Sequence, residues 1–99
     1  MAKAAKKKPS ILNDVSLDFF RNYINTPSPV GFESNGQKLW IEYIRPFVDE
    51  IMTDPYGSAV GIINPSHPFK VVIEAHVDEI SWFVNYVTNE GLIYLKRNG

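Results

Sequence analysis

The stretch that decides the fold covers residues 70–84 and reads KVVIEAHVDEISWFV. It begins with an apolar, β-branched run at residues 71–73, which is typical of a strand buried on both faces. The polar group AHVDE follows, and a second apolar run begins directly after it. The pattern predicts a central strand at residues 70–75 that delivers polar side chains to the edge of a sheet.

His76 and Asp78 are the candidate functional pair in this stretch. Because alternate residues of a strand project to the same face, we expect these two side chains to lie together while Val77 points away. A neutral histidine that binds a metal ion while a carboxylate holds its ring is the pair that a metal site requires. A chance pair, or a hydrogen-bonded cap at a strand end, fits the same spacing. The residues alone leave these interpretations open.

Composition narrows the classes of protein and of site. The chain has 99 residues, of which 44% are hydrophobic and 21% charged, and these values are typical of a globular domain. Its net charge of −1 argues against a nucleic-acid or membrane-surface partner. The absence of cysteine excludes disulfides and thiolate ligands, and it fits a cytoplasmic location. Any metal site would use histidine and carboxylates, which suit zinc, cobalt or manganese.

The rest of the chain predicts a tail, two helices and two hairpins. We expect a disordered basic tail at residues 1–13, because no apolar stretch of signal-peptide or transmembrane length follows its lysines. Apolar residues recur at helical spacing over residues 14–25, with Asp14 or Ser16 as N-cap, and over residues 34–47. Strands are expected, as two hairpins, at residues 49–54, 59–64, 80–88 and 92–96.

Two further features concern the loops and the end of the chain. His67 stands in the loop NPSHP, where the flanking prolines favour an exposed residue and not a ligand. The last apolar strand, at residues 92–96, has nothing after it that would cover its edge. Complete domains avoid such uncovered strands, so we expect the chain to be a fragment of a longer protein.

Four segments together resemble the tetrahedral, or deblocking, aminopeptidases of metallopeptidase family forty-two, which includes glutamyl aminopeptidases. The segments are TPSPVGFE, DPYGS, EAHVDEI and NEG, at residues 26–33, 54–58, 74–80 and 89–91. The third is the specific one, because it matches the family's A-H-x-D-E-I motif, and the resemblance covers nearly all of the chain after about residue 14. The chain departs from the family's usual residues at Val30, Ser58 and Ser81, none of which is a ligand.

The resemblance implies a role for each residue of the pair and a fold. His76 would bind one ion of a two-metal centre, and Asp78 would orient that histidine. The fold would be α/β, with residues 14–81 forming the N-terminal part of a zinc-peptidase-like mixed sheet flanked by helices. Residues 82–99 would begin an inserted β-barrel dimerisation domain. Family members are much longer, so the other ligands and the glutamate that acts as general base would lie outside these residues.

The function implied by the resemblance is that of an N-terminal segment of a binuclear metalloaminopeptidase. The parent protein would bind two divalent metal ions, remove N-terminal residues from peptide substrates, and form homo-oligomers in which dimers assemble into dodecamers. The chain alone is expected to be inactive, because one imidazole does not hold a catalytic metal ion.

Two alternatives come from other functional classes. A glycoside hydrolase would need a carboxylate pair, but Glu74 and Asp78 would lie roughly 13 Å apart on a strand, beyond the ~5 to 9.5 Å that such a pair needs. A non-catalytic, stand-alone α/β module or interaction fragment needs no complete active site. That second alternative predicts a chain that folds cooperatively by itself.

Overall fold

The computed structural model describes residues 12–99, so most of the predicted tail at residues 1–13 lies outside the described residues. Helix α1 spans Asp14–Ile24, where the sequence predicted it. Its N-cap is Asn13, whose side chain accepts a hydrogen bond of 2.8 Å from the backbone N–H of Ser16. The predicted caps were wrong because Asp14 and Ser16 already lie inside the helix, whereas Asn13 has the extended backbone that a cap requires.

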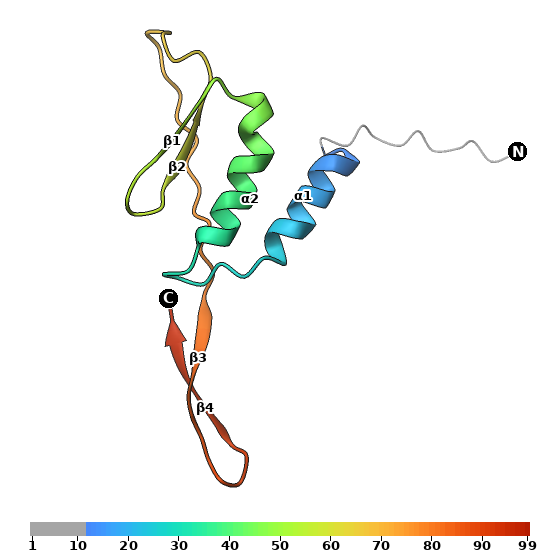
Figure 1. Ribbon diagram of the computed structural model, residues 1–99, viewed down its shortest axis with the longest axis vertical. Coiled ribbons are helices and arrows are strands. Elements are labelled where there is room, and N and C mark those ends of the chain that lie inside the picture. Colours follow the sequence, from blue (N-terminus) through green and yellow to red (C-terminus); the bar gives the residue numbers. More distant parts are fainter. Residues whose placement is uncertain (1–11) are drawn as a thin grey trace, which may run out of the picture.

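Helix α2 spans Ser34–Ile44 and continues as a short 3₁₀ turn, η1, at Arg45–Phe47. The helical geometry changes there because Pro46 has no N–H with which to extend the α-helical hydrogen bonds. The two helices lie side by side (Figure 1), and the rings of Phe19 and Tyr43 stack between them with centroids 3.8 Å apart. The Tyr43 hydroxyl also lies 3.0 Å from the Ser16 hydroxyl. Tyr43 of α2 therefore serves the packing of the two helices.

Strands β1 (Glu50–Thr53) and β2 (Ala59–Ile62) form the first predicted hairpin and pair antiparallel. Asp54 closes its turn, because its Oδ1 accepts hydrogen bonds of 2.9 Å from the N–H groups of Tyr56 and Ser58. The hydrogen bonds with Ser58 are the main cause that holds the pKa of Asp54 below its usual value. Gly61 lets the hairpin approach α2 closely, since a Cβ there would lie 2.7 Å from Ile44 Cδ1.

Strands β3 (Ser81–Val87) and β4 (Ile93–Asn98) form the second predicted hairpin, again antiparallel, with an irregularity between Val84 and Tyr86. This hairpin extends away from the helices (Figure 1). Its base is tied to the rest of the chain by Asn98, whose side-chain amide donates to the carbonyl oxygen of Val30 at 3.0 Å. The two hairpins are separate sheets and share no strand.

The predicted central strand at residues 70–75 is wrong for this chain, since residues 70–78 form neither a strand nor a bridge. Its apolar side chains are open to solvent, with Val71, Val72 and Ile73 exposed by 75%, 83% and 94%. A strand exists only through hydrogen bonds to a neighbour, and no strand of the described chain pairs with this segment. The first pairing after it is an isolated parallel bridge between Pro29 and Glu79.

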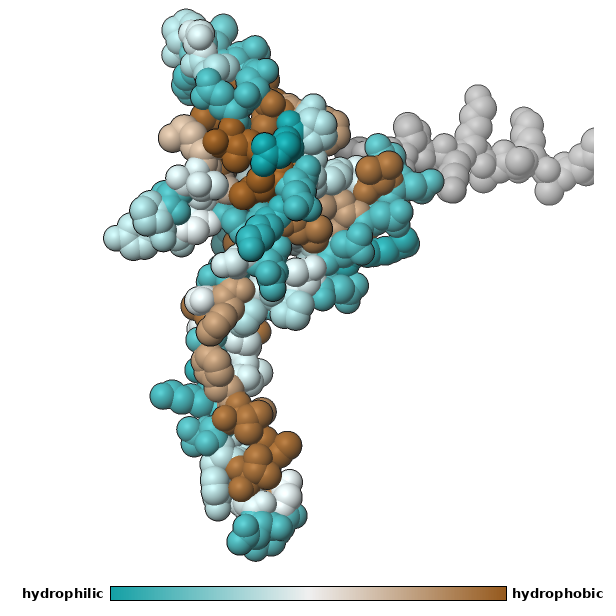
Figure 2. Space-filling view, in the orientation of Figure 1, coloured by the Kyte–Doolittle hydropathy of each residue, from teal (hydrophilic) through white to brown (hydrophobic). Residues whose placement is uncertain are grey.

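The α/β class is confirmed, but the described residues form no hydrophobic core. Not one apolar side chain of residues 12–99 is fully buried. Figure 2 shows apolar residues, in brown, along the β3–β4 hairpin and also in the upper part of the molecule, where the helices and the β1–β2 hairpin lie. Neither helix of the described chain has the length and apolar composition that crossing a membrane requires. The fold therefore consists of locally formed elements joined by a few specific contacts.

Candidate functional site

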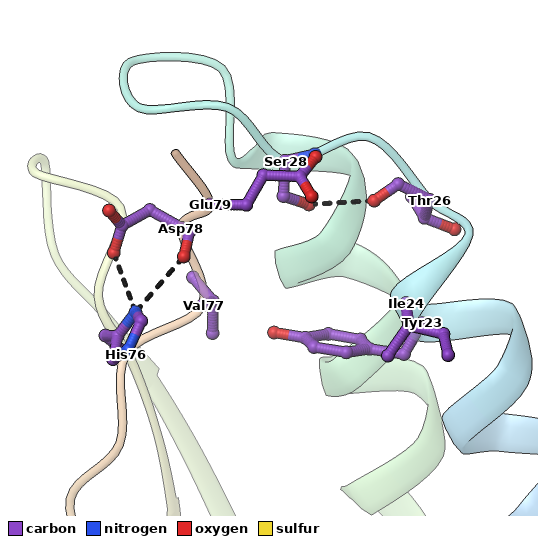
Figure 3. A pocket seen from close by; sticks show the side chains of 8 residues that line it. All are labelled: Tyr23, Ile24, Thr26, Ser28, His76, Val77, Asp78 and Glu79. Carbon is purple, nitrogen blue, oxygen red and sulfur yellow. Dashed lines mark hydrogen bonds and ion pairs between the residues drawn. The ribbon is translucent and has the colours of Figure 1, made fainter. Parts of the chain in front are cut away.

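The predicted pair lies where two distant segments meet. Residues 76–79 face the loop at residues 26–31 and the end of α1, and a pocket of about 210 Å³ lies between them (Figure 3). Its lining combines polar and apolar side chains: Tyr23, Ile24, Thr26, Ser28, His76, Val77, Asp78 and Glu79. A shallow, partly polar pocket therefore adjoins the His-x-Asp segment.

The structure brings His76 and Asp78 together as the sequence predicted. His76 Nδ1 lies 3.1 Å from Asp78 Oδ1 and 3.1 Å from the backbone oxygen of Asp78. Both side chains lie on one side of the segment, while Val77 lies on the other (Figure 3). The side chain of His76 is 85% exposed and that of Asp78 42%. The ring is therefore held at one edge and open to solvent elsewhere.

The contacts of His76 assign its tautomer. A carboxylate oxygen and a carbonyl oxygen only accept hydrogen bonds, so the neutral ring must carry its proton on Nδ1. The lone pair then lies on Nε2, for which no protein partner is present among the described residues. This is the state in which imidazole binds a metal ion, with the other ring nitrogen donating to a carboxylate or carbonyl.

Glu79 is a residue whose role sequence reasoning missed. Its side chain points opposite to that of Asp78, toward the loop (Figure 3). Its Oε1 accepts a hydrogen bond of 2.9 Å from the N–H of Ser28, and its own N–H donates to the carbonyl oxygen of Ser28 at 2.9 Å. The predicted alternation placed Glu79 on the face away from Asp78, but nothing in the sequence identified its partner, 51 residues earlier.

Ser28 is the anchor on the loop side. It is 5% exposed, the one buried polar residue in the described chain. Its hydroxyl donates to the carbonyl oxygen of Thr26 at 3.3 Å. Gly36 in α2 lies against it so closely that a Cβ at Gly36 would collide with the Ser28 hydroxyl oxygen. The loop can therefore pack directly against α2 because Gly36 has no side chain.

The opposite wall of the pocket comes from α1. Tyr23 and Ile24 contribute it, and Val77 lies across from the tyrosine ring (Figure 3). Partial burial raises the pKa of Tyr23 above its ordinary value, because removal from water disfavours the phenolate. At neutral pH this side of the pocket is therefore uncharged.

The other candidate residues lie outside this pocket. His67 is an exposed loop residue, as predicted, and its Nδ1 lies 3.2 Å from the backbone nitrogen of Phe69, which donates to it. Glu74 is exposed and does not line the pocket. Thr26 and Ser28 of the TPSPVGFE segment line the pocket, while the rest of that segment and DPYGS supply local turns, in which Glu33 accepts from the N–H of Gly31 and Asp54 closes the hairpin.

The donor set of the described chain provides one ligand and does not complete a metal site. His76 offers Nε2, but no group of three histidine, aspartate or glutamate side chains within residues 12–99 is placed to hold an ion. A catalytic zinc ion takes three protein ligands. The residues present therefore supply one ligand position, and a complete metal site requires further ligands from outside the described chain.

Comparison with known proteins shows that the chain is similar to aminopeptidases over a part of their length. No family model matches it. A lysyl aminopeptidase of Pyrococcus furiosus is 28% identical over 80 residues, which cover 80% of this chain and 23% of that protein. The crystal structure of a TET aminopeptidase from a marine-sediment Thaumarchaeota archaeon matches with a TM-score of 0.75 and 26% identity, covering 87% of this chain and 24% of that one.

These matches leave most of each relative without a counterpart. The chain spans about a quarter of the length of the curated relatives it matches. It is therefore similar, in sequence and in fold, to one segment of an aminopeptidase.

Proposed function

We propose that this chain is the N-terminal segment of a binuclear metal-dependent aminopeptidase of the tetrahedral, deblocking type. In this proposal the full-length protein removes N-terminal residues from peptides. His76 supplies one metal ligand, and Asp78 holds that histidine in the binding tautomer. The remaining ligands and the general base come from sequence beyond the described residues.

The observation that carries the proposal is the state of His76. Its Nδ1 lies 3.1 Å from Asp78 Oδ1 and 3.1 Å from the backbone oxygen of Asp78, while Nε2 has no hydrogen-bond partner among the described residues and the side chain is 85% exposed. A carboxylate that fixes the tautomer of a ligating histidine is the usual partner of a metal-bound imidazole. The aminopeptidase relatives supply the reaction class, because both matches cover this segment.

The exposed apolar surface favours a segment over a stand-alone module. A module that folds alone must bury enough hydrophobic surface to offset the loss of chain entropy. The described residues bury no apolar side chain fully, and the large ones on β3 and β4 are half exposed or more. In the proposal this hairpin begins the inserted β domain through which subunits dimerise. Further chain or a second subunit would cover it.

The bound ions would act as Lewis acids toward the carbonyl of the scissile peptide bond. This chain's contribution is the orientation of one ligand and a pocket beside it. The pocket wall of Tyr23, Ile24 and Val77 is uncharged at neutral pH.

The test uses the full-length protein that contains this chain. We expect aminoacyl-p-nitroanilides to be hydrolysed, activity to be lost on dialysis against a chelator, and activity to return with zinc, cobalt or manganese. His76→Ala should lower bound metal per subunit and reduce kcat/KM by at least ~100-fold, since a ligand and its charge stabilisation are both lost. Metal content is measured by atomic emission.

The matched control is His67→Ala, because the second histidine is also exposed but lies in a separate loop. It should leave metal content and kcat/KM within about twofold of the wild type, as a surface substitution does. Activity that survives complete metal removal, or equal losses in the two histidine variants, would contradict the proposal. Hydrolysis by the isolated 99-residue chain would contradict the assignment of the missing ligands.

A further inference from the structure

We propose that Glu79 is a positioning residue, which sets the orientation of His76 through the peptide unit that joins Asp78 to Glu79. This inference rests on the proposed metal-binding role of His76. It concerns a different residue, whose side chain touches neither the imidazole nor the pair's carboxylate in any hydrogen bond found.

The peptide unit between residues 78 and 79 links the loop to the imidazole. Its N–H, from Glu79, donates to the carbonyl oxygen of Ser28 at 2.9 Å. Its C=O, from Asp78, lies 3.1 Å from Nδ1 of His76. A peptide unit is planar, so fixing its N–H also fixes the direction of its C=O. The loop and the imidazole are therefore connected through one rigid group.

The Glu79 carboxylate completes this connection. The backbone connects the loop and the segment at the isolated bridge between Pro29 and Glu79, where the N–H of Glu79 donates to the carbonyl oxygen of Ser28. Oε1 adds a second hydrogen bond, from the N–H of Ser28, so both backbone groups of Ser28 bind the same residue. Two hydrogen bonds to one residue define an orientation that a single bond does not.

The loop side of the connection is itself fixed. Ser28 is buried against α2, where Gly36 leaves no room for movement toward the helix. A mobile Ser28 would not fix the orientation of Glu79. Because Ser28 is buried against α2, its hydrogen bonds hold the 78–79 peptide at a defined position relative to the helices. Residues 70–75 pair with no strand in the described chain, so this contact, together with the hydrogen bond from Asn98 to Val30, joins the His-x-Asp segment and the hairpin after it to the rest of the fold.

Two variants separate geometry from charge. Glu79→Gln keeps the length and an oxygen acceptor but removes the negative charge. Glu79→Asp keeps the charge but shortens the side chain by one methylene, so its carboxylate no longer reaches the N–H of Ser28. A positioning role predicts that Gln behaves as the wild type and that Asp behaves as Glu79→Ala. An electrostatic role predicts the reverse order.

The experiment measures the apparent zinc affinity of the full-length protein by competition with a chromophoric chelator. Solid-state ¹⁵N NMR of the metal-free, histidine-labelled protein reports the tautomer of His76, assigned by difference from His76→Asn. We expect Glu79→Ala and Glu79→Asp to lower zinc affinity by ~10- to 100-fold, the usual cost of removing an outer partner of a ligand. Both should convert the single Nδ1–H signal into a mixture, while Glu79→Gln retains it.

Glu74→Ala is the matched control, an exposed carboxylate five residues earlier for which no hydrogen bond is found. It should leave affinity and tautomer unchanged. Wild-type tautomer and affinity in Glu79→Ala and Glu79→Asp would overturn the inference, and so would a loss in Glu79→Gln alone. If the wild-type protein binds no metal, the proposed function fails, yet the tautomer still decides the role of Glu79. Should Glu79→Ala not fold, the Gln and Asp variants decide it.

Discussion

The two halves of the described chain are built in opposite ways. In residues 12–62 the helices and the first hairpin pack on one another through the Phe19–Tyr43 stack and the close approach of Gly61 to Ile44. Residues 70–99 are as rich in apolar residues, but their strands contact mainly each other and their large side chains stay exposed. Apolar sequence alone therefore does not produce a core. Each apolar face also needs a second element to cover it.

The candidate site lies at the joint between these halves. Hydrogen bonds between Ser28 and Glu79, and from Asn98 to Val30, join the two halves there. Directional bonds fix the orientation of a side chain more narrowly than hydrophobic contact does. The difference explains why the His76–Asp78 geometry is present although the strand predicted before it has no partner.

The largest effect is expected from placing a charge in each half. Ile44→Lys should reduce the helical circular dichroism of the isolated chain, because the side chain of Ile44 in α2 packs against Gly61 of β2. Val72→Lys should leave that signal unchanged, since Val72 is almost fully exposed here. Under the proposed function residues 70–75 become a covered strand in the full-length protein, where Val72→Lys should cost about 3 kcal/mol or more because it leaves an unpaired charge buried.

The measurements are far-UV circular dichroism of the isolated chain and urea unfolding of the full-length protein. An unchanged free energy of unfolding in full-length Val72→Lys would contradict the contrast between the halves. So would an isolated chain that loses its helices equally in both variants.

A smaller effect is expected at the joint from Gly36→Ala. Helix propensity alone predicts stabilisation by about 1 kcal/mol, because alanine is the best helix former. The structure predicts the opposite sign, because the new Cβ collides with the Ser28 hydroxyl oxygen. We expect a loss of about 1–3 kcal/mol in the free energy of unfolding of the full-length protein, which is typical of overpacking.

The double variant Gly36→Ala/Ser28→Ala provides the control, because removing the Ser28 hydroxyl makes room for the new Cβ at residue 36. It should recover most of the loss, which urea unfolding of all four members of the cycle measures. Stabilisation by Gly36→Ala alone would show that the loop is not seated on α2.

The smallest effect concerns pH and Tyr23, on the pocket wall. Burial raises its folded-state pKa above the unfolded value of about 10, so its contribution to stability is complete below that pH. The contribution is then lost as pH rises through the folded-state pKa. Relative to Tyr23→Phe, the wild type should lose stability only above about pH 10. Equal pH slopes in the two proteins, measured by urea unfolding, would contradict this burial.

The sequence predicted every element whose signal is local. The 3.6-residue spacing in α1 and α2, and the turns DPYGS and NEG, located two helices and two hairpins. The paired placement of His76 and Asp78 followed from alternation over three residues. The prediction failed where an element depends on a partner, because residues 70–75 have strand composition but no neighbouring strand. It also missed the contact between Ser28 and Glu79, which no local pattern encodes.

The orientation of His76 is tested most directly by anomalous diffraction at the zinc absorption edge from crystals of the full-length protein. The account predicts an ion about 2.0–2.1 Å from Nε2 of His76, the usual zinc–nitrogen distance, with Nδ1 still bonded to Asp78. Zinc bound through Nδ1, or a zinc centre that leaves His76 free, would contradict it.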